Sequence, residues 1–212
     1  MDNTIIYYTA NTEDEAFERK IRNNILAVSN DLPIISVSRK PIDFGYNICV
    51  GEWPVCYANE HRQLLVGLQA AKTRFCIAAE ADVLYPPEYF AFTPPTVDHV
   101  YRYDNVYAWY LWRSKRFYGK YWHKSFTEGA QMCGREYWIE RIKKTVNTNW
   151  NEIEDPPLIF GDGIRPQYSW TGNPVITIKT GKGVRRYTTK VYQYETTLPY
   201  WGDITELERK YT

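Results

Sequence analysis

The chain has 212 residues, of which 44% are apolar and 24% charged, and its formal net charge is only +1. This composition is typical of a soluble globular protein, and no stretch approaches the roughly 20 apolar residues of a membrane span. The N-terminal sequence lacks the features of a signal peptide and the four cysteines lack the close spacing of zinc ligands, so we expect a cytoplasmic protein with reduced thiols.

The first segments have the pattern of a strand, a helix and a second strand. Thr4–Thr9 is rich in β-branched and aromatic residues, which favours a strand. Thr12 is placed as the N-cap of a helix that runs to Val28, because acidic residues follow it and apolar residues then recur at helical spacing. Pro33–Ser38 is a second short strand. A helix between two strands predicts that the strands are parallel.

The next segment is expected to supply a loop, a helix and a buried central strand. Gly45–Pro54 is loop-like, and Tyr57–Lys72 places its leucines on one helical face. Arg74–Ala79 is continuous and apolar, as a central parallel strand should be. Two carboxylates, Glu80 and Asp82, follow that strand directly.

The second half combines strands with two helices. The pattern predicts one or two strands in Val97–Trp112, a helix over Gly134–Thr145 and a short helix near Ile204–Lys210. The residues after about 150 are rich in Gly and Pro and strand-like. Because we find no internal repeat, low-complexity tract or linker, the sequence predicts a single α/β domain over residues 1–212.

Glu80 and Asp82 raise the question of what two neighbouring carboxylates do at the end of a buried strand. They can form part of a simple turn, since Asp and Glu are common there and Pro86-Pro87 stops the strand. They can also hold a cation, since neighbouring carboxylates repel each other and Mg²⁺ and Mn²⁺ prefer oxygen ligands. Ligands of open α/β sheets bind at the carboxyl ends of the strands, which favours a metal site.

The order of these segments resembles a GT-A glycosyltransferase, close to the family 2-like proteins of phages and bacteria. The resemblance is carried by TIIYYTANTEDEAFERKIRNNI, LPIISVSRKP, NEHRQLLVGLQAAKTRFCIAAEADVLYPPEYF and GAQMCGREYWIERI, and EADVLYPPEYFAFTPP is similar to a recurring block of small phage-type members. It covers residues 4–145 and implies a Rossmann-like, mixed but mostly parallel sheet flanked by helices. Residues 1–100 would bind the nucleotide-sugar, and a β-rich part, 101–212, would bind the acceptor. A phage-encoded protein would act in the host cytoplasm.

The resemblance also implies a metal-dependent, inverting transfer from a UDP-sugar. Asp82 would be the main ligand of Mn²⁺ or Mg²⁺, and Glu80 would contact the metal or the ribose of the donor. The implied donor-binding residues are Thr9, Ala10, Asn11, Glu13, Arg39, Arg62 and Glu80. The metal and nearby cations would neutralise the diphosphate leaving group as the anomeric bond breaks. Arg39 and Arg62 can equally be solvated surface residues.

An inverting transferase also needs a carboxylate that accepts the proton of the acceptor hydroxyl. The resemblance places this base after GAQMCGREYW, where Glu152 and Asp155 are the preferred candidates, ahead of Glu154 and Asp162. The first three can equally belong to a solvated acidic turn, and Asp-Gly more often marks a turn.

One feature of many GT-A enzymes is missing, namely a late histidine that acts as a third metal ligand. Thr180 stands where we would expect it, and the last histidine is His123. The metal would then be held by one or two carboxylates with phosphates and water. His61, His99 and His123 can be ordinary polar residues.

The second half is basic and aromatic, which indicates an anionic acceptor. Residues 101–212 carry 18 Lys and Arg against 12 Asp and Glu, whereas residues 1–100 carry 8 against 13. Basic side chains bind phosphates and aromatic faces stack bases, so we expect double-stranded DNA as the acceptor. The resemblance to small phage-type transferases implies a hydroxymethylated pyrimidine, 5-hydroxymethylcytosine, in that DNA. The candidate acceptor-binding residues are Arg113, Lys115, Arg116, Tyr118, Lys120, Trp122, Arg185 and Arg186.

Two other functions fit the same sequence. Tyr and Trp also line carbohydrate sites, so a saccharide or lipid-linked glycan is an alternative acceptor. A non-catalytic module that binds nucleotide or nucleic acid is a second alternative, because the late histidine is missing and Ala81 separates the two acids. No protein partner is evident, and the sequence does not specify which sugar is transferred.

Overall fold

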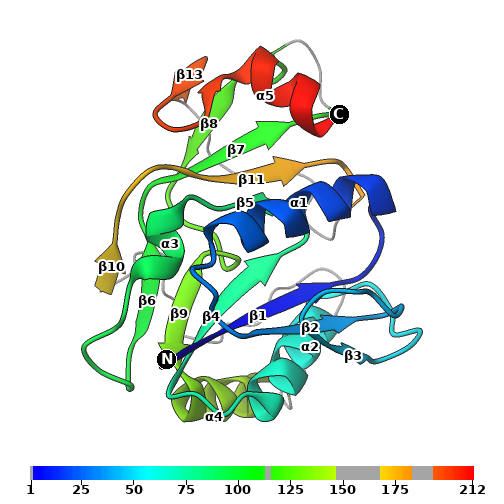
Figure 1. The fold of residues 1–212 in the computed structure, drawn as a ribbon, viewed down its shortest axis with the longest axis vertical. Helices are drawn as coiled ribbons and strands as arrows, with labels where there is room; N and C mark the ends of the chain where they lie inside the picture. The colour runs from blue at the N-terminus through cyan, green and yellow to red at the C-terminus, as the bar shows by residue number, and fades with distance from the viewer. Residues whose placement is uncertain (1, 113–115, 147–167, 183–192) are drawn as a thin grey trace.

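The computed structural model describes residues 2–112, 116–146, 168–182 and 193–212. Within them, the larger sheet has seven strands in the order β10-β6-β9-β4-β1-β2-β3 (Figure 1). These strands are β1 (Asn3–Thr9), β2 (Ile34–Ser38), β3 (Tyr46–Cys49), β4 (Phe75–Glu80), β6 (Val100–Tyr103), β9 (Gln131–Gly134) and β10 (Tyr168–Trp170). Strands β3, β2, β1 and β4 are parallel, whereas β9 is antiparallel to both of its neighbours.

Helices cover both faces of the larger sheet. The described helices are α1 (Glu15–Val28), α2 (Tyr57–Ala70), α3 (Pro87–Ala91), α4 (Arg135–Val146) and α5 (Ile204–Tyr211). Side chains of a strand alternate between its two faces. Accordingly, Ile5 and Tyr7 of β1 belong to the core cluster that includes α1, whereas Ile6 and Tyr8 pack in the cluster with α2 and α4. The core on both sides of β1 and β4 therefore fixes the ends of these two strands.

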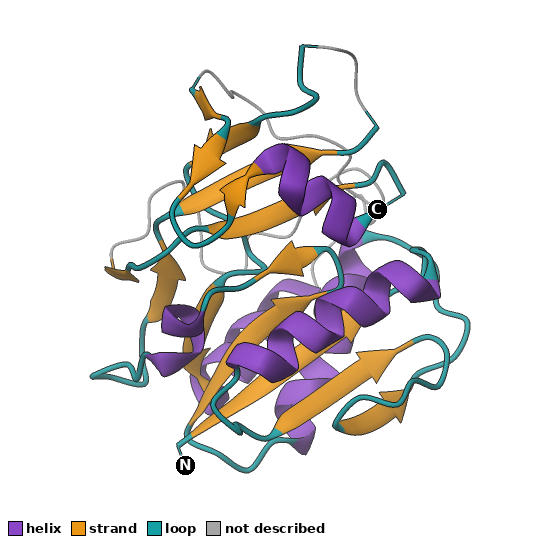
Figure 2. Cartoon of the chain, turned by 45° about the horizontal axis from the view of Figure 1, so that its top comes forward, coloured by secondary structure: helices purple, strands orange, loops and turns teal. Residues whose placement is uncertain are grey.

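A smaller sheet lies above the larger one in Figures 1 and 2, and α5 lies at its top in Figure 1. Its strand order is β12-β8-β7-β11-β5. These strands are β5 (Val83–Leu84), β7 (Val106–Tyr110), β8 (Tyr121–Lys124), β11 (Val175–Lys179) and β12 (Tyr194–Glu195), and β13 (Thr197–Leu198) pairs separately with β14 (Gly202–Asp203). Because β5 follows β4 after only two residues, the chain passes from one sheet to the other at Ala81 and Asp82.

The predicted α/β fold with a mostly parallel sheet is confirmed, and three local predictions are wrong. Residues 46–49 form strand β3 instead of a loop, because they pair in parallel with β2 and the Asn47 amide bonds to the Ser36 and Ser38 hydroxyls. Helix α1 has Asp14 as its N-cap instead of Thr12. Pro87 begins the short helix α3 instead of only a turn, since proline is tolerated at the first helical position.

All four cysteines are free, and Cys56, Cys76 and Cys133 are buried while Cys49 is exposed, as predicted for reduced thiols. Of the helices in the described part of the chain, none has the length and apolar content that crossing a membrane requires.

Candidate donor and metal site

The carboxyl ends of β1 and β4 lie at the topological switch point of the larger sheet. Strands β2 and β3 follow one another outward on one side of β1, whereas β4 lies on the other side of β1. The crevice at such a point is where open α/β sheets bind ligands. The register pairs Tyr8 of β1 with Glu80 of β4. The predicted acids and the predicted nucleotide-binding end of β1 therefore lie at one edge.

Glu80 is the last residue of β4, and its side chain is held in place by groups from other segments. Its Oε1 accepts a hydrogen bond of 2.8 Å from the Tyr8 hydroxyl, and its backbone N–H donates to the Tyr85 hydroxyl at 2.9 Å. Gly129 packs directly against the carboxylate, leaving no room for a Cβ. Burial, together with the charges of Glu60 and Asp82, raises the pKa of Glu80 to about 8.

Asp82 lies in the two-residue turn between β4 and β5 and is anchored to the smaller sheet. Its backbone carbonyl accepts a hydrogen bond of 2.6 Å from the N–H of Ile178. Its Oδ2 lies 3.9 Å from Nζ of Lys179, the last residue of β11. The side chain of Asp82 is 26% exposed while that of Lys179 is only 9% exposed. The carboxylate of Asp82 is therefore partly open to solvent and lies beside a buried cation.

Two further carboxylates, Glu60 and Glu13, complete an acidic cluster around Asp82. Burial raises the pKa of Glu60 to about 7, and the charge of Asp82 adds to this effect. Burial also raises the pKa of Glu13, where the hydrogen bond from the Thr180 hydroxyl opposes the shift and the charge of Asp82 adds to it. The charge of Asp82 thus reaches three other carboxyl groups. Strongly perturbed carboxyl groups that meet in a crevice are typical of functional sites.

His61 and Glu128 form an ion pair next to this cluster. Nε2 of His61 lies 3.6 Å from Oε2 of Glu128, and its Nδ1 is 2.9 Å from the carbonyl oxygen of Tyr57. Burial alone would lower the pKa of His61, but the Glu128 carboxylate outweighs burial and raises it to about 9. Sequence analysis missed Glu60, Glu128 and Lys179. The one available signal was that Glu60 and His61 lie in the first turn of a helix that leads into β4.

The residues predicted to bind the nucleotide lie where β1 and β2 end. Asn11 has a left-handed backbone with φ of 50°, and its Oδ1 accepts hydrogen bonds of 2.9 Å from the N–H groups of Arg39 and Lys40. The Arg39 guanidinium donates to the Ala10 carbonyl at 3.2 Å and to Glu52 at 2.5 Å. Arg39 is therefore fixed by its neighbours instead of extending freely into solvent. The structure brings Ala10, Asn11 and Arg39 together at the edge that also holds Glu80.

Thr9 and Arg62, two other predicted donor residues, have structural partners. The buried Thr9 hydroxyl donates to Oε1 of Glu18 at 2.9 Å, so its side chain faces α1. The guanidinium of Arg62 donates to the Asn59 side chain on its own helix at 2.8 Å. The backbone oxygen of Thr9 accepts from Gln63 Nε2 at 2.9 Å, which joins α2 to the end of β1. Their role in donor binding stays a prediction.

The predicted metal can be tested against these oxygen ligands. Among the residues that the structure describes, no three Asp, Glu, His or Cys side chains are close enough to hold an ion by themselves. Mg²⁺ and Mn²⁺ are, however, commonly bound by one or two carboxylates together with substrate phosphates and water. Glu80 and Asp82 fit this mode, because both supply carboxylate oxygens at the end of β4. When both are ionised they repel each other, and a bound cation would relieve this repulsion. A cage made of protein groups alone is not formed by the described residues.

Of the predicted acceptor residues that the structure describes, Trp122 lies on β8 of the smaller sheet, and Arg116, Tyr118 and Lys120 lie in the segment that leads into β8. Nζ of Lys120 is 4.3 Å from the ring centroid of Tyr194 and the Arg116 guanidinium is 5.6 Å from that of Phe117. The Tyr118 hydroxyl donates to Glu208 of α5. Trp122 is only 4% exposed, so little of its ring is open to a partner. The predictions for Arg113, Lys115, Arg185 and Arg186, and for the bases Glu152, Asp155, Glu154 and Asp162, lie outside the described residues.

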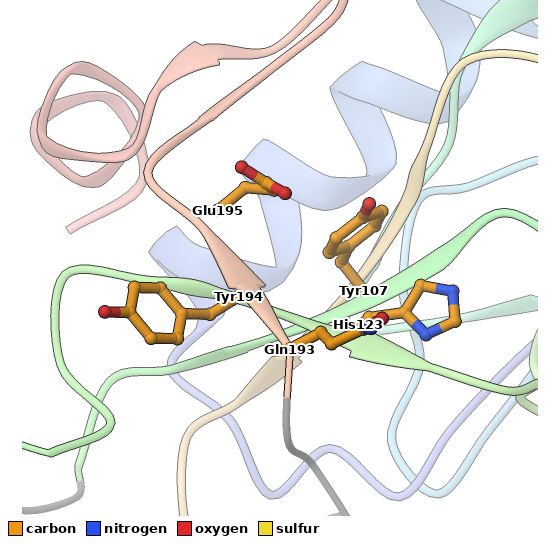
Figure 3. Close-up of a pocket in the computed structure, with 5 residues that line it drawn as sticks. All are labelled: Tyr107, His123, Gln193, Tyr194 and Glu195. Atoms are coloured by element: carbon orange, nitrogen blue, oxygen red, sulfur yellow. The ribbon is translucent and has the colours of Figure 1, made fainter.

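A pocket of about 460 Å³ lies on the same sheet (Figure 3). It is lined by Tyr107, His123, Gln193, Tyr194 and Glu195. Tyr107 and His123 are register partners on β7 and β8, and their rings meet edge to face at 5.5 Å. Tyr194, whose ring contacts the ammonium of Lys120, lines this pocket and also belongs to a basic aromatic surface formed with Arg116 and Lys120.

Comparisons with known proteins concern the fold. No family model and no curated protein matches the chain. The inositol-1-phosphate CTP transferase from T. maritima is 11% identical over 89% of this chain and 92% of its own, with a TM-score of 0.51. A glycosyltransferase involved in glycosylation of the major capsid of PBCV-1 is 13% identical over 81% of both chains, with a TM-score of 0.47. A Drosophila β1,4-galactosyltransferase 7 mutant in complex with manganese, UDP-Gal and xylobiose is 9% identical over 66% of this chain and 52% of its own, with a TM-score of 0.40.

At such identities a structural likeness concerns the architecture alone. The T. maritima comparison spans almost the whole of both chains, and the strand order of the larger sheet has its switch point between β1 and β4. The Rossmann-like, mostly parallel α/β fold expected from the sequence is therefore confirmed. The closer resemblance to small phage-type transferases stays a prediction.

Proposed function

We propose that this chain is a glycosyltransferase that moves a sugar from a UDP-sugar to an acceptor hydroxyl with the help of Mn²⁺ or Mg²⁺. The observation that carries the proposal is the position of Glu80 and Asp82 at the carboxyl end of β4, at the switch point of the sheet and beside the end of β1, where the charge of Asp82 also acts on Glu13 and Glu60. Carboxyl groups that lie near one another and repel when ionised favour a cationic ligand there.

The donor lies, in this proposal, along the carboxyl edge from β2 to β4. The nucleoside rests against Ala10 and Asn11, where the Asn11 side chain already fixes the backbone of Arg39. Asp82 and Glu80 would hold the metal ion together with the diphosphate of the donor. The bound metal supplies the charge that stabilises the leaving diphosphate. The Tyr8 hydroxyl and Gly129 keep the Glu80 carboxylate in one position, which is the preorganisation that such stabilisation requires.

The acceptor we propose is 5-hydroxymethylcytosine in double-stranded DNA, bound by residues 101–212. The support is the surface formed by Arg116, Lys120 and Tyr194, where cations lie on aromatic rings. Such a surface suits phosphates and bases, although saccharides also stack on Tyr. A saccharide is therefore the alternative acceptor. Glu152 or Asp155 remains our candidate for the base that accepts the proton of the acceptor hydroxyl.

Nucleotidyl transfer is the second candidate function. The T. maritima protein with a TM-score of 0.51 is a CTP transferase, and the crevice could accept a nucleoside triphosphate in the same orientation. The two reactions differ in their products. A glycosyltransferase releases UDP, whereas a nucleotidyltransferase releases pyrophosphate from the triphosphate.

The test is an incubation of the protein with Mn²⁺, a panel of UDP-sugars, and either hydroxymethylcytosine DNA or oligosaccharides. Nucleoside and oligosaccharide masses are then measured, with release of UDP and of pyrophosphate from CTP and UTP followed in parallel. We expect a hexose mass on hydroxymethylcytosine and none with unmodified DNA. Transfer to an oligosaccharide alone would replace DNA by a glycan acceptor. Pyrophosphate release without UDP release would favour nucleotidyl transfer, and no turnover at all would leave a binding module.

A further inference from the structure

Lys179 is a buried cation beside Asp82, and its position depends on both sheets. The backbone oxygen of Lys179 accepts a hydrogen bond of 3.0 Å from Leu111 on the β7 side. The N–H of the preceding residue, Ile178, donates to the Asp82 carbonyl at 2.6 Å. These two contacts fix the end of β11 directly above the turn that follows β4. Only 9% of the Lys179 side chain is exposed, so the ammonium is held at the crevice instead of moving in solvent.

The ammonium of Lys179 is near anions but is not fully engaged by them. Its distance of 3.9 Å to Asp82 Oδ2 is that of an ion pair and exceeds the usual length of a hydrogen bond. An ammonium has three N–H donors, and Asp82 at this distance saturates none of them. The charge of Lys179 also reaches Glu60 and Glu80, whose pKa values it lowers against the effect of burial. Within the part of the chain that the structure describes, the Lys179 ammonium therefore lies near several carboxylates with donors to spare.

The next residues connect the same turn to the end of β1. The Thr180 hydroxyl donates to Glu13, and Nζ of Lys182 lies 3.5 Å from Asp14. The segment 179–182 thus spans the carboxyl edge from β4 to the start of α1. It places the positive charge of Lys179 at the edge where the proposed donor would carry its two phosphates.

We infer that Lys179 binds the diphosphate of the nucleotide. Its ammonium supplies part of the positive charge at the phosphates, in place of a metal ion that is held more firmly by a third protein ligand. The inference rests on the proposed function. It predicts that nucleotide diphosphates bind even without metal, because a positive charge of the chain itself faces the phosphates. It also predicts that Lys179 competes with the metal ion for Asp82. A purely structural ion pair would lack the first property, which is therefore the one that decides.

The experiment measures the binding of UDP and of uridine in EDTA by calorimetry or by NMR titration for the wild type, Lys179→Met and Lys179→Arg. Lys72→Met serves as the matched control, because Lys72 is exposed and precedes the amino end of β4, opposite the crevice. We expect Lys179→Met to weaken UDP binding by about tenfold or more, the range for a hydrogen bond to a charged group, while uridine binding stays within about twofold. Lys179→Arg, which keeps the charge, should retain UDP binding within about threefold.

A second readout uses Mn²⁺ alone, without nucleotide. Lys179→Met should bind Mn²⁺ more tightly than the wild type, because Asp82 no longer shares its charge with an ammonium, so the variant changes UDP and metal affinity in opposite directions. Unchanged UDP binding in Lys179→Met, or an equal loss for uridine, would overturn the inference. If the Met variant does not fold, Lys179→Gln takes its place. A wild type that binds uridine nucleotides neither with Mn²⁺ nor without it would refute the proposed function itself, which is a distinguishable result.

Discussion

The hydroxyl group of Tyr8 donates a hydrogen bond of 2.8 Å to Oε1 of Glu80, and this contact joins the ends of β1 and β4 at the candidate site. The Tyr85 hydroxyl accepts from the Glu80 backbone and donates to the Gly129 carbonyl at 2.6 Å. Gly129 in turn packs against the Glu80 carboxylate. Tyr8 and Gly129 therefore position the Glu80 carboxylate while Tyr85 holds its backbone, and each residue can be altered separately.

Replacing Gly129 by alanine should displace the Glu80 carboxylate with little change elsewhere. A Cβ at this position would overlap the Glu80 carboxyl group, so Glu80 has to move and its hydrogen bond with Tyr8 breaks. We expect metal-dependent turnover to fall by about tenfold or more, the scale of a misplaced active-site group. Steady-state kinetics with a UDP-sugar at several Mn²⁺ concentrations measure the effect.

Gly202→Ala is the matched control for this change. Gly202 has φ of 74°, so alanine is strained there, but the nearest atom to an added Cβ is 3.8 Å away and lies in α5. This variant should lose stability and keep the metal dependence of turnover. If Gly129→Ala behaves like Gly202→Ala, Glu80 does not need its observed position.

Substituting Asp82 by asparagine should abolish most activity and leave the fold intact. The side chain is partly exposed, and the hydrogen bond that anchors this turn to β11 uses the backbone carbonyl, which the substitution keeps. We expect turnover to fall by about 10²-fold or more, as for loss of a charged group that stabilises the transition state. Circular dichroism and urea unfolding check that the chain still folds.

The control for Asp82→Asn is Asp2→Asn, at an exposed position next to the amino end of β1. It removes the same charge at the opposite edge of the sheet. Full activity of Asp82→Asn in the presence of Mn²⁺ would contradict our assignment of the metal site.

The place of the acids is predictable from the sequence because the signal is local. A central parallel strand is a continuous apolar run, and Glu80 marks its end as the first charged side chain after Phe75. The strand-helix-strand order then puts this end beside the end of β1. Strand β3 gives no such signal, because it is a short strand of partly exposed residues, and its pairing depends on the hydrogen bonds of Asn47.

The partners of the acids are not predictable, because they come from distant parts of the chain. Lys179 reaches Asp82 only after β11 has paired with β5 in the smaller sheet. Glu128 meets His61 only when the segment before β9 has folded over α2. Neither residue stands in a local pattern that distinguishes it from a solvated charge. Thr12 fails as a cap for the opposite reason, since the local pattern fits but the helix starts at Glu15.

The stability of the free protein should fall as the pH rises from about 5 to 9. The pKa values of Glu18 and Glu60 are raised to about 7 and that of Glu80 to about 8, chiefly by burial, so the folded chain binds protons that the unfolded chain has released. Stability is lost as such groups ionise. His61, with a pKa raised to about 9 by Glu128 against the effect of burial, contributes stability that is likewise lost as the pH rises through 9.

Urea unfolding at pH 5.5, 7 and 8.5 measures this dependence. We expect the free energy of unfolding to decrease by about 1 kcal/mol or more over the range, since one pKa unit corresponds to about 1.4 kcal/mol. Glu60→Gln should make the decrease smaller, whereas Glu140→Gln, at an exposed residue whose pKa is lowered by Lys144, should not. A stability that rises with pH in this range would show that these acids are ionised in the folded protein at neutral pH.

The acceptor surface gives a prediction that does not depend on catalysis. If Arg116 and Lys120 contact DNA phosphates, duplex binding falls steeply with salt, because each neutralised phosphate releases condensed counterions. The double variant Arg116→Gln/Lys120→Gln should bind a duplex more weakly and reduce the slope of log K against log salt by about 2. Fluorescence anisotropy between 50 and 300 mM NaCl, about the range over which such slopes are measured, provides the data.

Tyr194→Leu separates charge from stacking at this surface. Nζ of Lys120 lies 4.3 Å from the centroid of the Tyr194 ring, and Tyr194 is about half exposed. The ring can therefore both orient the lysine and stack on a base. Loss of the ring should weaken duplex binding. The slope of log K against log salt should change by less than about 1, the contribution of one phosphate contact, because no charge is removed. Lys144→Gln on α4 removes a charge remote from the smaller sheet and should leave both affinity and slope unchanged. If the double variant and Tyr194→Leu both bind duplex DNA like the wild type, the basic aromatic surface does not bind DNA, and a saccharide becomes the better acceptor.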